Sequence, residues 1–267
     1  MAKPPQKQRI DLLLVERELV GSRAEAQRLI MANKVTVNNA RVGKPGTRVH
    51  VDAEIEIEQG LPYVSRGGLK LAAALDAFDA SVQGLAVADV GASTGGFTDC
   101  LLQRGARRVY AIDVGYGQLA WSLRQDPRVV VMERTNARHV HKLPEAVQLV
   151  TVDVSFISLG LILPRARDWL TTDGAIIPLI KPQFEAEKEK VGKGGVVRDA
   201  RIHREVLLRI MTWAAGNGLP PKGLIRSPIR GPAGNIEFLA LLLKSASPCT
   251  LDINAAIEAA VRQAQND

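Results

Sequence analysis

Five short apolar runs constrain the fold of this 267-residue chain more than any other feature. They cover residues 86–89, 108–113, 129–133, 149–153 and 175–182. Unbroken apolar strands that alternate with helices are typical of a parallel sheet covered on both faces. Two later strands, at 222–227 and 235–244, are joined by a short loop and are expected to form an antiparallel pair at the edge of that sheet. The pattern therefore predicts an α/β, Rossmann-like domain.

Each of the five runs ends on a polar side chain. The carboxyl ends of parallel strands meet at one edge of the sheet, where ligands of such sheets bind. One acid at a strand end is often a helix cap, but five polar residues at successive ends are not easily explained by structure alone. These residues are Asp89, Asp113, Glu133, Asp153 and Lys181.

The first run leads into a turn of small residues, AVADVGASTGGFT at 86–98, and then into a helical pattern. Glycines let a ligand approach the backbone closely, so a nucleotide-like ligand is expected. The dinucleotide fingerprint G-x-G-x-x-G is incomplete, because Ser93 stands where its middle glycine would be. Asp89 would repel a pyrophosphate and could attract a cationic amino-acid end. We therefore expect S-adenosylmethionine as the cofactor, and a nicotinamide-dependent oxidoreductase is the weaker alternative.

The positive charge is concentrated at the N-terminus. Residues 1–50 carry +6 of the formal net charge of +7. Such asymmetry is typical of a surface that contacts nucleic acid phosphates. A basic face that is merely solvated is the alternative.

The N-terminal 58 residues predict a small α+β module. Helices are expected at 9–20 and from a capping box at Ser22 and Glu25 to about residue 32, followed by strands at 34–37, 40–42 and 48–58. The pattern L-V-x-S-R-x-x-A-x-x-L-I, with V-x-V-N after it, resembles the RNA-binding domain named after ribosomal protein S-four. The resemblance implies that basic side chains of this module contact structured RNA. The predicted RNA-binding residues are Arg17, Arg23, Arg28 and Lys34, together with Arg66 and Lys193 beyond the module.

Several long strings over the rest of the chain are similar to those of the TlyA family. They are YVSRGGLKL, DVGASTGGFTD, DVGYGQLAWSLR, ERTNAR, SFISL, LIKPQFE, VGKGGVVRD and SPIRGPAGNIEF. The resemblance implies an S-adenosylmethionine-dependent rRNA 2′-O-methyltransferase related to the FtsJ/RrmJ group, acting on cytidine ribose in ribosomal RNA. It divides the chain into an RNA-binding domain at 1–58, a linker at 59–65 and a class I methyltransferase domain at 66–267.

The same resemblance implies a catalytic tetrad of Lys70, Asp153, Lys181 and Glu237. A ribose hydroxyl is a poor nucleophile near neutral pH, so a base has to take its proton. A lysine can do this only when burial or a second cation lowers its pKa. Lys181 is the candidate base, the two acids would orient the lysines, and which lysine is neutral stays open. No metal is required, because a sulfonium carries its own activated methyl group.

The predicted cofactor site combines the glycine turn with the polar strand ends. Asp113 suits a ribose hydroxyl, with a helix cap as its alternative role. The predicted residues are Asp89, Gly91, Ala92, Ser93, Gly95, Gly96, Phe97, Asp113, Glu133, Asn136 and Asp153.

Two other segments have both a functional and an ordinary interpretation. The lysine- and glycine-rich loop at 185–199 would be a flap that grips RNA backbone, or a simple solvated loop. Tyr116 and Trp121 could pack on adenine or on a flipped nucleotide, although core packing is the expected role of Trp121.

The absence of long apolar stretches and the cysteine content bear on the alternatives to a methyltransferase. No secretory leader and no apolar stretch of roughly 18 residues is visible, which disfavours a membrane-active haemolysin and favours a cytoplasmic protein. Cys100 and Cys249 have neither metal-ligand spacing nor a disulfide framework. An RNA-binding protein without turnover remains an alternative. The expected partner is ribosomal RNA or a ribosomal subunit, and the oligomeric state stays open.

Overall fold

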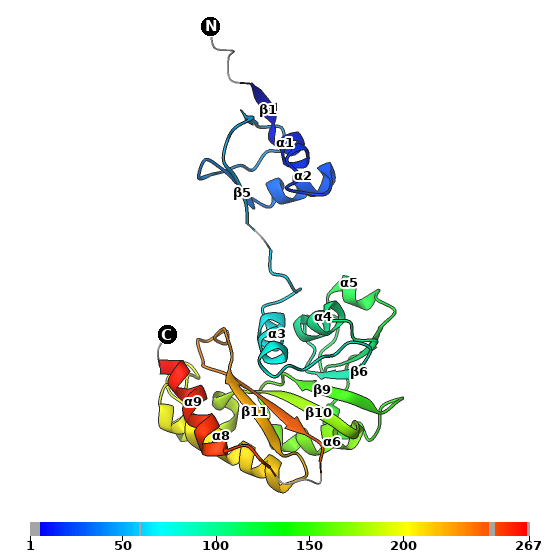
Figure 1. The fold of residues 1–267 in the computed structure, drawn as a ribbon, viewed down its shortest axis with the longest axis vertical. Helices are drawn as coiled ribbons and strands as arrows, with labels where there is room; N and C mark the ends of the chain where they lie inside the picture. The colour runs from blue at the N-terminus through cyan, green and yellow to red at the C-terminus, as the bar shows by residue number, and fades with distance from the viewer. Residues whose placement is uncertain (1–5, 59, 246–248, 266–267) are drawn as a thin grey trace. The chain divides into compact units, whose positions relative to one another are not determined.

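The computed structural model describes residues 6–58, 60–245 and 249–265 and divides the chain into two compact units, Met1–Pro62 and Tyr63–Asp267 (Figure 1). Part of the basic N-terminus, residues 1–5, and Gln59 of the expected linker lie outside the described residues. The first unit contains β1 (Lys7–Arg9), α1 (Ile10–Glu16), α2 (Arg23–Met31), β2 (Val35–Val37), β3 (Ala40–Arg41), β4 (Arg48–His50) and β5 (Ile55–Ile57). It is therefore a small α+β module, as expected.

Helix α2 begins as its sequence predicts. The Ser22 hydroxyl accepts a hydrogen bond from the Glu25 amide at 3.2 Å, which satisfies one free donor of the first turn. The Glu25 carboxylate reaches back, but it accepts from the Gly21 amide at 3.0 Å. The cap therefore also includes Gly21, the residue before the N-cap Ser22.

The segment 48–58 is not one strand, as its alternating pattern predicted, but two. Strand β4 pairs with β1, whereas β5 pairs with β2 in a separate three-stranded sheet. The chain turns at 51–54 between them and buries Ala53. Alternation was correct on both sides of the turn, but it carries no information about which partner each half pairs with.

The second unit is built around a seven-stranded mixed sheet in the order β11-β12-β10-β9-β6-β7-β8. Its strands are β6 (Ala86–Val90), β7 (Arg108–Ile112), β8 (Val129–Met132), β9 (Val147–Val152), β10 (Leu170–Ile180), β11 (Pro221–Arg226) and β12 (Phe238–Leu243). The first five are mutually parallel, and β12 runs antiparallel to both of its neighbours. The predicted Rossmann-like fold is confirmed, and the strand order reverses between β6 and β9.

Helices cover both faces of this sheet (Figure 1). One apolar core joins the sheet to α3 (Gly67–Ala77), α4 (Gly96–Gln103) and α5 (Trp121–Arg124), and the other joins it to α6 (Leu163–Trp169), α8 (Ala200–Gly216) and α9 (Ile253–Gln265). Shorter helical segments are η1 (Ala137–His139), η2 (Leu159–Leu161), α7 (Pro182–Glu185) and η3 (Lys188–Lys190).

Helix α9 was not predicted from the sequence. It buries Ile257, Ala260, Val261 and Ala264 beside α8 and β11. Three of these four side chains are alanine or valine, so its apolar stripe is weak in sequence and is recognised only once the helix is seen to pack.

Candidate active site

The register of four strands brings the predicted catalytic residues to one edge of the sheet. Val152 of β9 lies opposite Val90 of β6 and Pro178 of β10, and Ile180 of β10 lies opposite Phe238 of β12. The residues that follow β9 and β10 and the residue before β12 therefore end at the same edge. They are Asp153, Lys181 and Glu237.

Two lysine–carboxylate pairs form at this edge, and Asp153 is the one member of the four that is only half-buried. Lys181 Nζ lies 2.6 Å from Asp153 Oδ1 and donates a hydrogen bond of 2.9 Å to Ser155 Oγ. Lys70, from α3, donates to Glu237 Oε2 at 2.5 Å. Glu237 is only 1% exposed, and Lys70 is 7% exposed. Charged side chains are rarely buried to this degree unless they are paired, so each pair holds its lysine in a defined place.

A cavity of about 450 Å³ opens beside the first pair. One part of its wall is polar and contains Ser93, Asp113 and Asp153, and another part is apolar and contains Ile112 and Ile157. The predicted cofactor residues that line it are Gly91, Ser93, Asp113, Asn136 and Asp153. A cavity with both kinds of wall suits a ligand that has a nucleoside and a charged amino-acid end.

Three other residues of the predicted cofactor set act by packing. A Cβ on Gly96 would lie 2.2 Å from Ser65 Oγ, and one on Gly95, at φ +99°, would lie 2.2 Å from Leu123. Phe97 is buried in the core between α4 and the sheet. These residues shape the turn that carries the cavity wall, and none of them, nor Ala92, lines the cavity.

Asp89 does not line the cavity either. Its carboxylate is fully buried and accepts hydrogen bonds from Thr98 Oγ1 at 2.7 Å and Thr151 Oγ1 at 3.0 Å. Burial raises the pKa of Asp89 to about 7, against the two hydroxyl donors, which lower it. In this structure Asp89 ties β6 to α4 and β9.

This burial predicts a pH-dependent stability. The pKa of Asp89 is higher in the folded chain than in the unfolded one. Its contribution to the free energy of unfolding is therefore fully present below about pH 4 and is lost as the pH rises through about 7. Asp89→Asn, which cannot ionise, is expected to lose less stability than the wild type between pH 5 and about 8. Urea denaturation of both proteins across this range measures it. Parallel curves for the two proteins would contradict the raised pKa.

Asp113 and Glu133 organise the loops on the far side of the cavity. The two oxygens of Asp113 accept hydrogen bonds from the Ser93 amide at 2.8 Å and the Gly115 amide at 2.7 Å. Glu133 accepts from the Gly117 amide at 2.9 Å and forms an ion pair with Arg124. Asp113 lines the cavity, whereas Glu133 does not.

Ser155 and Phe156 also line the cavity, and neither was predicted from the sequence. Phe156 has a positive φ of +63° and is 89% exposed, and its ring lies 4.7 Å from that of Phe184. A strained backbone and an exposed ring at the edge of a cavity are typical of functional sites. The string SFISL, which begins two residues after Asp153, was the available signal. The expectation that Trp121 packs in the core is wrong, because its side chain is 74% exposed.

The predicted RNA-binding residues fall into two groups. Arg17 donates to the carbonyls of Val51 and Ala53, and Arg23 donates to the buried Asp11 at 3.0 Å, so both hold the first unit together. The other four, Arg28, Lys34, Arg66 and Lys193, are exposed or half-buried. Among the residues that the structure describes, these four make none of the structural contacts that occupy Arg17 and Arg23.

Two kinds of feature are absent from the residues that the structure describes. No helix within them is long and apolar enough to cross a membrane. They also contain no group of three or more His, Cys, Asp or Glu side chains that could hold a metal ion.

Comparison with known proteins gives matches over nearly the whole chain. The model of the FtsJ-like methyltransferase family matches residues 63–244, and that of the S4 domain matches residues 8–55. The Bacillus subtilis protein named "Putative rRNA methyltransferase YqxC" is 52% identical over 87% of this chain and 84% of its own length. The Mycobacterium tuberculosis 16S/23S rRNA (cytidine-2′-O)-methyltransferase TlyA is 47% identical over 88% and 89%. The solved structure of a "Putative hemolysin" from Streptococcus thermophilus covers 98% of this chain and 97% of that one, with 44% identity and a TM-score of 0.75.

Proposed function

Because this chain belongs to the FtsJ-like methyltransferase family, we propose that it transfers the methyl group of S-adenosylmethionine to a ribose 2′-hydroxyl of ribosomal RNA, on a cytidine. The observation that carries the proposal is the presence of two ion pairs, Lys181–Asp153 and the buried Lys70–Glu237, at the strand edge beside the cavity. Relatives with matching sequence carry the same activity in their names.

The cavity fits the proposed cofactor. Asp113 already accepts two backbone donors, and an anionic carboxylate with further lone pairs suits the hydroxyls of a ribose. The apolar wall formed by Ile112, Val114 and Ile157 suits a base. Gly91 lines the cavity, and the absence of a side chain there lets the turn approach the Asp153 carbonyl closely. The sulfonium of S-adenosylmethionine would supply an activated methyl group.

The chain's own residues would then accept the proton of the ribose hydroxyl and orient that hydroxyl. Lys181 Nζ would pass one proton to the Asp153 carboxylate, 2.6 Å away, and would then take the proton of the ribose hydroxyl as that oxygen is methylated. Asp153 and Ser155 hold that nitrogen in place. Lys70, fixed by Glu237, presents a positive charge from α3 that stabilises the developing oxyanion. In-line positioning of the hydroxyl supplies much of the rate.

RNA would be recognised by both units. The first unit matches a domain type described as S4, and its exposed Arg28 is suited to a phosphate. In the second unit the exposed ring of Phe156 at the mouth of the cavity offers a face on which a displaced base can stack. Structured RNA is recognised mainly by its shape and its backbone.

The test is transfer of labelled methyl from S-adenosylmethionine to purified 30S and 50S subunits that lack the modification. Label in rRNA that resists alkaline hydrolysis at one linkage is the expected result, because 2′-O-methylation removes the attacking hydroxyl. Label in protein, on a base, or on neither subunit would contradict the proposal.

The cofactor part has its own prediction. Asp113→Ala is expected to weaken S-adenosylmethionine binding about tenfold to a hundredfold, since it removes the ribose acceptor and frees the Ser93 and Gly115 amides. Isothermal titration calorimetry measures the affinity. Asp173→Ala, which changes an exposed acid on β10, is the matched control. Equal affinities for the two variants would exclude Asp113 from the cofactor site.

A further inference from the structure

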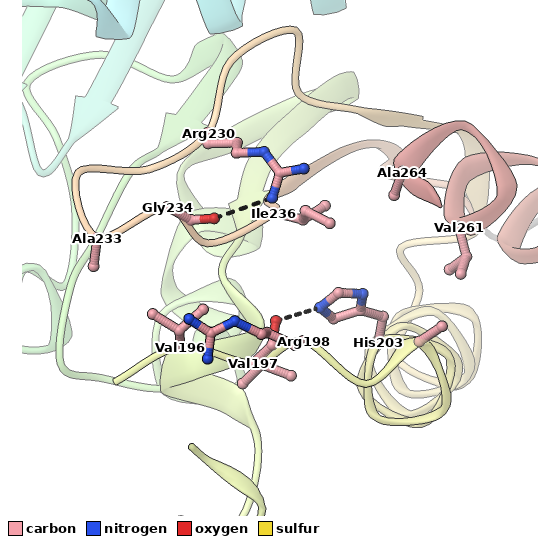
Figure 2. Close-up of a pocket in the computed structure, with 11 residues that line it drawn as sticks. Val196, Val197, Arg198, His203, Arg230, Ala233, Gly234, Ile236, Val261 and Ala264 are labelled. Atoms are coloured by element: carbon pink, nitrogen blue, oxygen red, sulfur yellow. Dashed lines mark hydrogen bonds between the residues drawn. The ribbon is translucent and has the colours of Figure 1, made fainter. Parts of the chain in front are cut away.

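A second cavity, of about 470 Å³, lies beside the Lys70–Glu237 pair and is separate from the cofactor cavity in its lining residues. Two loops, at 196–200 and 230–236, form one side, and α8 and α9 form the other (Figure 2). Its last loop residue, Ile236, directly precedes Glu237. A Cβ on Gly231 would lie 2.5 Å from Glu237 Oε1, so this loop touches the carboxylate that holds Lys70.

The two loops are locked together before any ligand binds. Asn235 is 2% exposed, and its side chain accepts from the Val197 amide and donates to the Gly195 carbonyl, each at 2.9 Å. His203 Nε2 donates to the Val197 carbonyl at 3.1 Å. Burial lowers the pKa of His203, so its ring adds no charge to the cavity at neutral pH. The cavity is therefore preformed, with a neutral polar floor.

Its charge comes from two arginines, one on each loop. Figure 2 shows Arg230 above the opening and Arg198 below it. Arg198 has no ion-pair partner among the residues that the structure describes, and Arg230 makes only a 3.4 Å hydrogen bond to the Gly234 carbonyl. The nearby acids are engaged elsewhere: Asp199 pairs with Arg201, and Glu237 pairs with Lys70. The described lining of this cavity therefore contains two arginines and no acidic residue.

We propose that this cavity binds a phosphodiester group of the substrate RNA next to the nucleotide that is methylated. Guanidinium forks match phosphate oxygens in geometry and charge, and arginine is favoured wherever such recognition matters. The apolar side formed by Ile236, Val261 and Ala264 suits the sugar or base attached to that phosphate. The inference rests on the proposed function and adds a fixed contact for the RNA strand at the loop that directly precedes Glu237.

The test compares R198A/R230A with R165A/R167A, which removes the same charge from α6, outside the lining of the cavity. The first variant is expected to raise the KM for RNA about tenfold, with kcat at saturating RNA unchanged. The slope of its plot of log Kd against log salt concentration is expected to be smaller by about 0.7, the value for one phosphate on a single strand. R198K/R230K, which keeps the charge but not the fork, is expected to recover the slope and only part of the affinity.

Two results would overturn the proposal. One is an RNA affinity and salt slope that are the same in R198A/R230A and R165A/R167A. The other is saturable binding of inorganic phosphate, lost in R198A/R230A, with RNA binding unaffected, since this would assign the cavity to a free phosphate. The salt dependence of RNA binding tests the role of the cavity even if no methyl transfer is found. Failure of the proposed function is therefore distinguishable from failure of this site.

Discussion

Lys181→Ala is expected to slow methyl transfer to ribosomal RNA by about 10²–10⁴-fold and to leave the affinity for S-adenosylmethionine nearly unchanged. Lys181 Nζ lies 2.6 Å from Asp153 Oδ1, whereas the residue does not line the cofactor cavity. Removing it therefore takes away the proton acceptor and leaves the binding surface in place. Single-turnover transfer of labelled methyl, with calorimetry of the cofactor, separates the two effects.

Two control variants test whether the effect is specific to a base at position 181. Lys222→Ala removes an exposed lysine from β11 and is expected to retain full activity. Lys181→Arg keeps a cation beside Asp153 but cannot release its proton in a protein, so it is expected to be as inactive as Lys181→Ala. An active Lys181→Arg enzyme would show that the position supplies charge and not a base.

Gly91→Ala is expected to destabilise the protein by about 3 kcal/mol and to abolish cofactor binding. The residue has φ +84°, and an added Cβ would lie 2.4 Å from the Asp153 carbonyl oxygen. The left-handed conformation costs about 1–2 kcal/mol for a residue with a side chain, and overpacking costs about 1–3 kcal/mol more. Since the clash pushes on Asp153, the Lys181 pair is displaced as well. Urea denaturation and calorimetry measure both consequences.

Gly117→Ala is the control for the backbone alone. Gly117 has a similar φ of +73°, and nothing lies within 4 Å of the position that an added Cβ would take. It is expected to lose about 1–2 kcal/mol and to bind the cofactor. If both variants lose the same stability and both still bind, the close approach of Gly91 to Asp153 is not what the site requires.

The sheet was predictable because its strands are buried on both faces and therefore remain apolar along their whole length. The five polar strand ends also followed from sequence, since parallel strands bring their carboxyl ends together. Helix α9 did not follow, because an apolar stripe of alanines and a valine becomes distinctive only against the surface of α8 and β11. Segment 48–58 split for a related reason, as strand pairing depends on partners distant in sequence.

The four proposed catalytic residues were named from the sequence, but their pairing was not. Lys70 and Glu237 are 167 residues apart, and only the fold reveals that one lysine is matched with each acid. Asp89 was expected to face a cationic ligand, but the hydroxyls of Thr98 and Thr151 enclose its carboxylate. Trp121 was misjudged, and Phe156 was not singled out, because an aromatic residue in a sequence is equally suited to a core and to an exposed recognition surface.

The place of β12 has a consequence for synthesis of the protein on the ribosome. This strand is the last of the sheet to be made, yet it lies inside the sheet, between β10 and β11. Until it inserts, β10 presents an unpaired edge and Lys70 has no carboxylate. The first 230 residues of a nascent chain can therefore form much of the cofactor cavity but not the complete catalytic edge. With the roles proposed for these residues, the site is complete only after one late step, when Glu237 enters with its strand.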